Sequence, residues 1–531
     1  MTRWGMVVDL GRCVGCQTCT IACKMENGLP PSTQWRTVLD VESGEFPDVT
    51  RTFAPMTCMQ CADPPCYDAC PTTATRVRED GIVWIVDEIC IGCGSCVVAC
   101  PYQARHLVPT EEYYFGRPTP DEVLNYDRGR VGICTKCHFC YHKFDDAPAG
   151  VVPGENPSYT PACSASCIAD AIQFGDLANP ASNVSKLIAA NPGATRMLEH
   201  LQTEPSVYYL NAPAIEDRPL RLQHTWHKLA VSNFVCGPAG VGLFVLGTLM
   251  GWLAGLPAPL LQFGGAAPLV AGIGLATPTP GHLAGLLGPL LALVGLLSVA
   301  AEAGRPLRGF NVFRNFRNSW MSRESVLAMI FISAALLDTL LVQNPFLQAA
   351  AALAGLGVVL AQGLILSKAK GVPAWSVPIM PAHFLASGLM LGGGALLLAT
   401  SAFSGRYALP GWLAPTVLAL VLIDWVVWVR YLRSRSPSAT FQRSVALLSQ
   451  GGFSVAIVYL GHLAPVVLLV AALLTPALLV PAGVGAGAAI LAGGLVARYG
   501  LIMKAAFLAD LFENFGTAKT QPVARPSTLA A

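Results

Sequence analysis

Cysteine is the residue type in this 531-residue chain whose spacing points most directly to chemistry. Sixteen of the 18 cysteines fall into four blocks ahead of residue 168. Blocks one and three have the spacing Cys-x2-Cys-x2-Cys-x3-Cys, block two is a stretched version, and block four is split by a 22-residue gap. The blocks are Cys13, Cys16, Cys19 and Cys23; Cys58, Cys61, Cys66 and Cys70; Cys90, Cys93, Cys96 and Cys100; and Cys137, Cys140, Cys163 and Cys167.

This spacing is typical of iron–sulfur clusters. Three thiolates at intervals of three residues wrap one corner of a cubane, and we expect the fourth to open a helix and reach the neighbouring cluster. Four blocks therefore predict two pairs of [4Fe–4S] clusters. A single Cys-x2-Cys is more typical of zinc, but repeated four-cysteine blocks argue against it. Disulfides fit dense triplets less well still, in a chain without a signal peptide.

Composition divides the chain into two parts. Residues 1–228 carry 18 basic and 26 acidic side chains, a net charge of −8, whereas residues 229–531 have a net charge of +10. Only 12% of all residues are charged and the mean hydropathy is +0.51, which indicates contact with lipid. We predict an α+β ferredoxin-like four-cluster domain followed by an all-α membrane bundle. The expected boundaries are 1–210 for the cluster domain, 211–228 for a linker, 229–510 for the anchor and 511–531 for a tail.

Eight apolar runs in the second part are long enough to cross about 30 Å of hydrocarbon, which takes roughly 20 helical residues. They are rich in Gly and Ala, which suits close helix packing in lipid. The stretch 256–280 is also apolar but contains five prolines, so we expect a loop or re-entrant segment there. The expected spans are about 230–254, 281–302, 325–343, 347–367, 380–401, 411–429, 459–480 and 482–503.

Basic residues predict the orientation of these spans. With eight spans, both ends of the chain lie on the same side as the cysteine-rich domain. Eleven basic residues fall on that side, against Arg406 alone in a loop on the other. The positive-inside rule then places the cluster domain in the cytoplasm, at the inner membrane. The eleven are Arg305, Arg308, Arg314, Arg317, Arg323, Lys368, Lys370, Arg430, Arg433, Arg435 and Arg443.

The connection between the second and third spans has the tightest group of charged residues near the membrane. An aromatic ring, hydrogen-bond donors and a carboxylate at this boundary suit a quinone headgroup, whose ring stacks and whose oxygens accept hydrogen bonds. The plainer alternative is that the arginines anchor helix ends at lipid phosphates. The expected quinone-contacting residues are Glu302, Arg305, Arg308, Trp320, Arg323 and Glu324.

Other membrane chemistry has weaker support in the sequence. Haem is often held by pairs of histidines. His282 starts its span from the far side, whereas His383 and His462 start theirs from the near side. A lone histidine at a helix start is more often a cap, so we predict no haem. Acids within the spans are sparse, with Asp338 and Asp424 as the main ones, which disfavours an ion pump.

These motifs resemble two subunits of the molybdopterin oxidoreductase family typified by dimethyl sulfoxide reductase, joined in one chain. Residues 1–210 resemble the four-cluster electron-transfer subunit, and residues 224–510 resemble the eight-span anchor. The motifs that carry the resemblance are Val8–Cys13, Ala22–Lys24, Met59–Cys61, Pro64–Cys66, Lys136–Cys140, Val207–Leu210, Gly304–Asn311 and Ser319–Glu324.

The resemblance implies which cysteines share a cluster, because in that family block one pairs with block four and block two with block three. Spacing alone permits either Cys134-x2-Cys137 or Cys137-x2-Cys140 in block four. The resemblance implies Cys137 and Cys140, which leaves Cys134 as an extra thiol. The implied ligand groups are Cys13, Cys16, Cys19 and Cys167; Cys23, Cys137, Cys140 and Cys163; Cys58, Cys61, Cys66 and Cys100; and Cys70, Cys90, Cys93 and Cys96.

The resemblance further implies an electron conduit between a separate catalytic subunit, with molybdenum or tungsten on a bis-pterin cofactor, and the membrane quinone pool. We expect net flow towards quinone. Inward-facing relatives include sulfite dehydrogenases and phenylacetyl-CoA:acceptor oxidoreductases. Three alternatives stay open: a redox-coupled ion pump, a reductase subunit fed by quinol, and a redox sensor without a catalytic partner. No nucleic-acid partner is expected.

Overall fold

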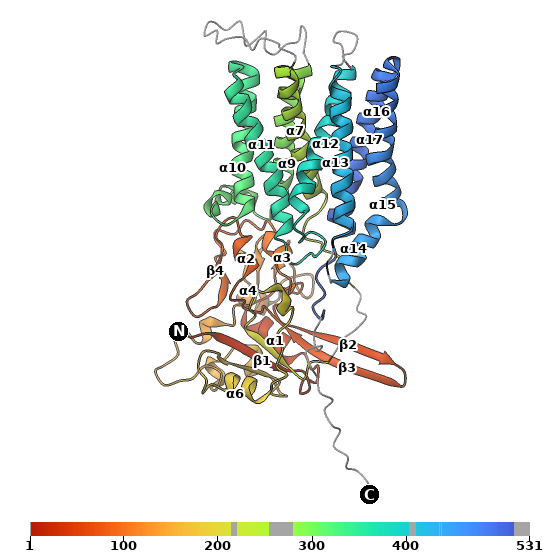
Figure 1. Cartoon of the computed structure of the whole chain (residues 1–531). Helices are drawn as coiled ribbons and strands as arrows, with labels where there is room; N and C mark the ends of the chain where they lie inside the picture. Colours follow the sequence, from red (N-terminus) through yellow and green to blue (C-terminus); the bar gives the residue numbers. More distant parts are fainter. Residues whose placement is uncertain are drawn as a thin grey trace.

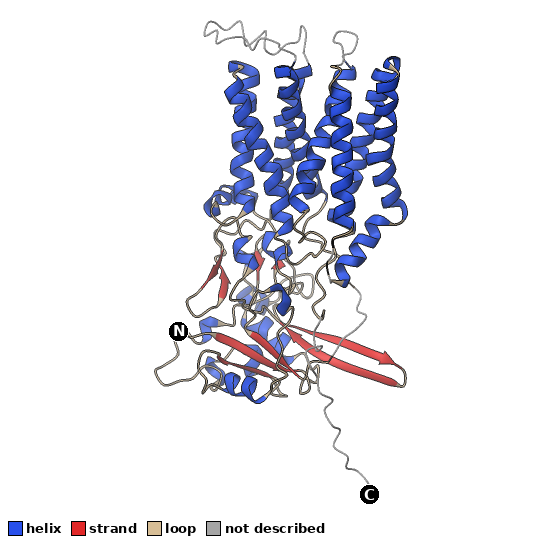
Figure 2. Ribbon diagram, viewed as in Figure 1, coloured by secondary structure: helices blue, strands red, loops and turns tan. Residues whose placement is uncertain are grey.

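The computed structural model describes residues 2–213, 220–253, 280–402, 410–434, 436 and 438–513. A cysteine-rich domain of short strands and helices lies at one end of a bundle of long helices (Figure 1). Figure 2 shows that the strands are confined to the cysteine-rich domain. The predicted ferredoxin-like domain followed by a helical membrane region is confirmed.

A three-stranded sheet ties the start of the cysteine-rich domain to its end. Its order is β8 (Ile172–Asp176), β1 (Trp4–Asp9) and β9 (Val207–Leu210), with β1 antiparallel to β8 and parallel to β9. Both faces of β1 are covered, because Met6 and Val8 lie in the main core while Val7 packs with α6 (Asn183–Ala190). Strand neighbours alternate between faces, so the consecutive apolar residues Met6, Val7 and Val8 are what a sheet buried on both sides requires.

Three hairpins complete the strands. The longest pairs β2 (Thr37–Glu45) with β3 (Asp48–Met56) and projects from the side of the domain (Figure 1). The second pairs β4 (Thr75–Val77) with β5 (Val83–Ile85). The shortest pair joins β6 (His106–Leu107) to β7 (Cys134–Thr135).

Short helices accompany the cysteine blocks: α1 (Thr18–Glu26), α2 (Pro65–Asp68), α3 (Ser95–Ala99) and α5 (Ala162–Ala165). A further helix, α4 (Pro120–Asn125), lies in the loop between β6 and β7. The expectation that the fourth cysteine opens a helix is wrong. Cys23 lies within α1, Cys100 caps the end of α3, and Cys70 and Cys167 follow their helices. Residues four apart share a helix face one turn apart, so the helix itself sends the third and fourth thiols to neighbouring positions.

Among the described residues, eight helices are long and apolar enough to cross a membrane, as predicted. The seventh begins at Gly451, eight residues earlier than expected, and includes a π-helical stretch η7 (Ala456–Leu463) between α15 (Gly451–Val455) and α16 (Ala464–Leu474). Residues 254–279, nearly all of the expected proline-rich loop, lie outside the described residues, as do Arg406 and Arg435. The other span helices are α7 (Lys228–Leu253), α9 (Pro280–Glu302), α10 (Trp320–Leu337) continued by η6 (Asp338–Val342), α11 (Pro345–Ser367), α12 (Met380–Ala402), α13 (Leu413–Leu432), and α17 (Leu479–Tyr499) continued by η9 (Gly500–Lys504).

The connections between helices bind the bundle to the cysteine-rich domain. The 3-10 segment η5 (Pro306–Asn315) joins α9 to α10, and α14 (Ala439–Ser449) follows α13. After η9 the chain returns to the cysteine-rich domain, where Ala509 accepts a hydrogen bond from the Gln103 side chain. Leu511 and Phe512 lie in the same core as Met6. Both described ends of the chain therefore lie on one side of the bundle.

Candidate functional site

Three cavities in the cysteine-rich domain are each lined by a group of four block cysteines. Each group takes three thiols from one block and one from another. The outermost group includes Cys16, which is exposed, whereas the other two are almost wholly buried. The lining groups are Cys13, Cys16, Cys19 and Cys167; Cys58, Cys61, Cys66 and Cys100; and Cys70, Cys90, Cys93 and Cys96.

The remaining four block cysteines gather near Asn27. The Asn27 amide nitrogen lies 3.6 Å from Cys140 Sγ and 3.8 Å from Cys23 Sγ. Cys137 and Cys163 also face Cys23, and all four are buried. The four groups are the same as those that the resemblance implies.

The extra thiol of Cys134 joins block three. It lines the cavity of Cys90, Cys93 and Cys96, and its Sγ lies 3.4 Å from Cys96 Sγ. A hydrogen bond from Cys134 lowers the pKa of Cys96, and the positive charge of Arg105 acts in the same direction. Cys134 is therefore placed beside a thiolate of block three and away from the group around Asn27.

Burial disfavours the charged form of most of these thiols. It raises the pKa of Cys90 to about 11 and that of Cys100 to about 12, so both thiols are protonated at neutral pH unless a metal ion is bound. Thiolate is the form that binds metal, so binding must release these protons. Within the described residues, no three His, Cys, Asp or Glu side chains could hold one metal ion together. Wider groups of four thiols suit a multi-iron cubane better than zinc.

Three buried cations lie among the thiols. Arg36 is 1% exposed and faces Cys163 and Cys19, with its Nη2 3.3 Å from Cys163 Sγ. Arg105 is 3% exposed and lines two of the cavities. Lys136, also 3% exposed, lies near Cys66 and Cys137.

The missing hydrogen-bond partners of these cations show whether the thiol groups fit iron–sulfur clusters. Nε and Nη1 of Arg36 and Nη2 of Arg105 are buried without a hydrogen-bond partner. A buried charge without compensation costs several kcal/mol. Four cysteine thiolates around a [4Fe–4S] core leave a net negative charge with sulfur acceptors, which is the partner that these cations lack. The residues present therefore fit the cluster in donor chemistry and in charge.

A cavity of about 380 Å³ lies where the cysteine-rich domain meets the bundle. Such a volume is within the usual range for small-molecule sites. Trp226, in its wall, donates a hydrogen bond from Nε1 to the Cys93 carbonyl oxygen at 3.0 Å. Across the same junction, Ser95 Oγ lies 3.6 Å from Met321 Sδ. The cavity thus adjoins both the membrane helices and the block-three thiols. Its polar and aromatic lining includes Asp63, Asp68, Ser95, Trp226, Arg317, Trp320, Lys368 and Lys370.

Of the six expected quinone-contacting residues, Trp320 is in the lining of this cavity, and Arg323 and Glu324 follow it on α10 without lining the cavity. The Arg323 guanidinium carbon lies 4.1 Å from the centre of the Trp320 ring. Glu324 is 5% exposed and accepts hydrogen bonds from Asn233 at 3.1 Å and Gln362 at 2.9 Å. Met321 is in the cavity wall. Residues three apart share a helix face, so Glu324 lies one turn further along the same face of α10.

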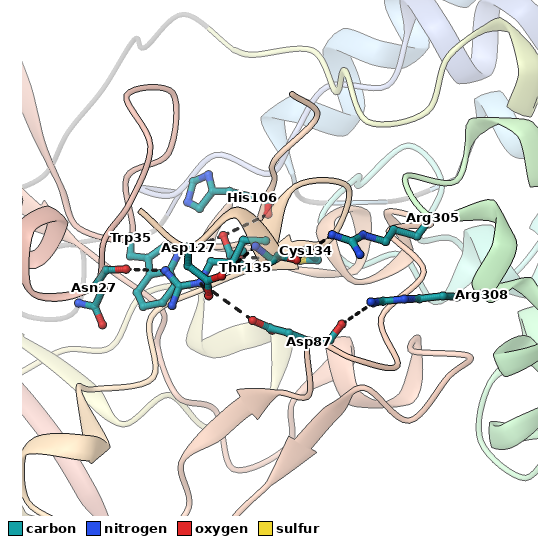
Figure 3. Close-up of polar contacts among 11 residues, drawn as sticks. Asn27, Trp35, Asp87, His106, Asp127, Cys134, Thr135, Arg305 and Arg308 are labelled. Atoms are coloured by element: carbon teal, nitrogen blue, oxygen red, sulfur yellow. Dashed lines mark hydrogen bonds and ion pairs between the residues drawn. The ribbon is translucent and has the colours of Figure 1, made fainter. Parts of the chain in front are cut away.

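The other three expected residues do not line the cavity either. Arg305 donates to the carbonyl oxygens of Val131 and Gly129. Arg308 donates to the carbonyl oxygen of Asp87 (Figure 3) and to that of Cys90. Both arginines thus fasten η5 to the cysteine-rich domain.

Glu302 is likewise engaged at the junction, where one carboxylate oxygen accepts a hydrogen bond from the His227 backbone N–H. Its other oxygen is buried without a partner.

Sequence reasoning missed Asp63, Asp68, Trp226, Lys368 and Lys370 as cavity residues. In the sequence the two lysines contribute only to the charge asymmetry. The two aspartates could have been suspected from their position within block two, because a cluster that passes electrons on must lie close to a neighbouring surface. Nothing in the sequence showed which surface that is.

Comparison with known proteins agrees with this site. The 4Fe-4S dicluster domain family matches residues 49–113. The chain is 42% identical over 221 residues to a selenate reductase subunit of Mesobacillus selenatarsenatis, covering 39% of this chain and 72% of that protein. It is 38% identical to the menaquinone reductase iron-sulfur cluster-binding subunit of Nitratidesulfovibrio vulgaris, covering 39% and 89%. For a polysulfide reductase subunit of Wolinella succinogenes, the identity is 36% and the coverage 39% and 93%.

The protein belongs to the family of iron–sulfur subunits of molybdopterin oxidoreductases. Members of this iron–sulfur subunit family carry electrons within oxidoreductase complexes, and here the cluster-binding part is continuous with eight membrane-crossing helices. The matches cover about two fifths of the chain, so this iron–sulfur subunit carries its own membrane anchor.

Proposed function

We propose that this protein carries electrons between a separate molybdenum or tungsten bis-pterin subunit and the membrane quinone pool, through four [4Fe–4S] clusters held by the four groups of cysteines. The clusters, when bound, accept and pass on single electrons. We further propose that a quinone headgroup binds in the junction cavity and that net flow is towards quinone. The observation that carries the proposal is the cavity itself, because one residue, Trp226, touches both it and the backbone of Cys93.

The chain's own residues have defined tasks in this proposal. The block thiolates bind iron, and their burial keeps water away from all groups except the one that includes Cys16. Arg36, Lys136 and Arg105 offset negative charge at successive positions between the thiol groups. A positive charge beside a cluster favours the form that has gained an electron.

In the junction cavity, Trp320 offers a face for the quinone ring, and its stacked Arg323 holds that face in place. The ammonium groups of Lys368 and Lys370 are donors for a carbonyl oxygen of the headgroup. Glu324, one helical turn beyond Met321, is a buried carboxylate positioned by Asn233 and Gln362.

Reoxidation by a soluble quinone tests the cavity. Full-length protein would be reduced with dithionite, and its cluster absorbance followed after addition of menadione. Removal of a charged donor in Lys368→Gln, or of the ring in Trp320→Leu, is expected to slow reoxidation about tenfold, the equivalent of about 1.4 kcal/mol. Arg314→Gln is the control, because Arg314 is exposed, donates to the Asn311 side chain and does not line the cavity. Equal rates in all four proteins, at equal iron content, would refute quinone binding in this cavity.

We also propose that the cluster domain faces the cytoplasm at the inner membrane. The support is the clustering of basic residues at the cluster-domain ends of the helices, among them Arg314, Lys368 and Arg430. A reporter enzyme that is active only after export, fused to the C-terminus, is expected to stay inactive. Activity of the fusion would reverse the orientation.

The catalytic partner is open to direct identification. Purification of the tagged full chain from its own membranes is expected to recover a large subunit that contains molybdenum or tungsten. The names of the relatives, which include selenate, polysulfide and menaquinone reductases, support a partner of this class. Recovery of the chain alone, with its iron intact, would favour a redox sensor instead.

A further inference from the structure

A group of four charged or titratable side chains is buried inside the membrane bundle, away from the junction cavity. Four different segments supply one residue each: His383 from α12, Asp424 from α13, His462 from η7 and Arg498 from α17. All four are 2–3% exposed. Asp424 lies eight residues before the end of α13, or about 12 Å along the helix, and so at hydrocarbon depth. Ionisable groups at such depth are rare and usually functional.

The hydrogen bonds of His462 determine how many protons the group must hold. His462 Nδ1 lies 3.0 Å from the Ile457 carbonyl oxygen, which can only accept, so Nδ1 carries a hydrogen. His462 Nε2 lies 3.1 Å from Asp424 Oδ2. A neutral imidazole in this tautomer would present a bare Nε2 to a carboxylate, and two acceptors would face each other. The contact therefore requires one additional proton, on His462 or on Asp424.

A buried arginine shares the site with this proton. Arg498 has its guanidinium 3.6 Å above the Phe384 ring and donates to Ser387 Oγ, while its Nε and Nη1 have no partner. With Arg498 and Asp424 both charged, the group is neutral without the extra proton and carries +1 with it. The two protonation states therefore differ by one unit of net charge inside the bundle, where an uncompensated charge is costly.

His383 offers a second place for the proton. Its Nδ1 lies 3.6 Å from Asp424 Oδ1, just beyond a hydrogen bond, and within the described part of the chain neither atom has a hydrogen-bond partner. Tyr431 stacks on His383, but its hydroxyl donates to the Ala374 carbonyl oxygen and so does not face the carboxylate.

Space for exchange exists at the same point. A cavity of about 10 Å³, the size of one water molecule, is lined by all four residues together with Gly461 and Gly493. The unpartnered atoms of His383, Asp424 and Arg498 are the polar contacts that such a water needs. His462 also lies in the π-helical η7, and π-helical turns within α-helices occur frequently at functional sites.

We propose that His383, Asp424, His462 and Arg498 form a proton-binding site within the membrane bundle that exchanges one proton with water. In the loaded state the proton lies between His462 Nε2 and Asp424 Oδ2, and in the empty state this contact loses its hydrogen bond. Loading takes one proton from water and involves no electron transfer. The site is separate from the junction cavity and does not depend on quinone binding there.

Infrared difference spectroscopy of the full-length protein in lipid nanodiscs tests the site. Between pH 5 and pH 8, in H2O and D2O, we expect an imidazole–carboxylate signal that titrates and exchanges. His462→Gln should abolish it, because the amide can donate to Asp424 permanently, and Asp424→Asn should abolish it by removing the carboxylate. Asp338→Asn, which changes the buried acid of η6, is the control and should retain it.

Three results would overturn the proposal: no titrating signal in the unmodified protein, persistence of the signal in both site variants, or a response to sodium concentration in place of pH. The site variants should match the unmodified protein in helical content by circular dichroism and in elution volume. Such a match excludes a folding defect as the cause of a lost signal. The measurement needs neither quinone nor catalytic subunit, so its outcome is independent of the proposed electron transfer.

Discussion

At the scale of single residues, the cysteine-rich domain places donors and cations around its thiols. Cys134 contributes a fifth thiol to one cavity, and Arg105 contributes a charge to two. Hydrogen bonds to cluster sulfurs and nearby charges are the levers by which proteins set reduction potentials. These two residues are therefore expected to set the potential of the group nearest the membrane.

Replacement of Cys134 tests this role. With Cys96 as a thiolate ligand, Cys134 can only donate, across a sulfur–sulfur distance of 3.4 Å. Cys134→Ala should lower the midpoint potential of one cluster by tens of millivolts, on the order expected for one hydrogen bond. Cys134→Ser, which keeps a donor, should shift it less, and Cys236→Ala in the membrane bundle is the control. Redox titration monitored by electron paramagnetic resonance measures the shift; identical potentials in all variants would exclude the hydrogen bond.

Asp87 gives the junction a dependence on pH. Burial raises the pKa of Asp87 to about 6, although Arg130 opposes the shift. The folded protein therefore binds this proton more tightly than the unfolded chain, so the stability it provides is lost as pH rises through 6. The apparent melting temperature should fall by about 2 °C more between pH 5 and pH 7 in the unmodified protein than in Asp87→Asn. Parallel curves for the two proteins would contradict the assignment.

Residue types and spacing picked out the cysteine blocks, because metal ligands recur at fixed intervals, while the choice of Cys137 and Cys140 over Cys134 came from the resemblance. The structure gathers these sixteen thiols into four groups, and their binding of iron stays a prediction. Residue types and spacing were not sufficient for the quinone-contacting residues. Arg305 and Arg308 share the charge and membrane-boundary position of a headgroup donor, yet both donate to backbone carbonyls of the cysteine-rich domain. Whether a boundary arginine faces a cavity or a neighbouring domain depends on docking, which local sequence does not encode.

At the scale of elements, the connection between α9 and α10 is the main fastening of the bundle to the cluster domain. Gly304 lies against Gly132, and a Cβ at Gly304 would come within 2.2 Å of the Gly132 carbonyl oxygen. The Arg305 N–H donates to the Ile91 carbonyl oxygen at 3.0 Å. Backbone meets backbone here, so no flexible side chain can move aside.

Gly304→Val should therefore loosen the junction, whereas Gly309→Val, in the same connection, should not, because nothing lies within 4 Å of a Cβ at Gly309. Limited proteolysis in membranes should release the cluster domain faster from Gly304→Val by about tenfold, which corresponds to a loss of about 1.4 kcal/mol. Equal release from both variants would show that the glycine contact does not hold the domains together.

The number of spans followed from hydropathy, since crossing hydrocarbon needs a minimum length of apolar helix. The start of the seventh span could not be predicted from hydropathy. Gly451 and Gly452 precede its apolar core and read as a break in the sequence, but both lie within α15, which runs into the π-helical η7. A π-helical turn needs a particular packing partner, so its presence at His462 was not visible in the pattern.

At the scale of the whole molecule, the first part of the chain is net negative and the second net positive, yet buried cations lie inside the negative part. The cysteine-rich domain has an excess of acidic residues, while its interior holds Arg36, Lys136 and Arg105. In the absence of iron, these cations would face protonated thiols and would have no compensating charge.

Iron removal should therefore affect the two parts differently. Anaerobic treatment with a chelator and oxidant, which takes out about sixteen iron atoms if all four groups are filled, should unfold the cluster domain and make it sensitive to protease. The membrane helices, held by lipid and helix packing, should keep their circular dichroism signal. A cluster domain that stays resistant after complete iron loss would show that the buried cations are satisfied without clusters.

The return of the chain to its starting domain has a consequence for biogenesis. Leu511 and Phe512 complete the core around Met6, yet the ribosome makes them only after the eighth span. The first domain to leave the ribosome is thus the last to be closed, and it must wait, incomplete, until the final helix has entered the bilayer. That delay leaves the domain open while iron is delivered, and correct insertion of the anchor becomes the step that seals it.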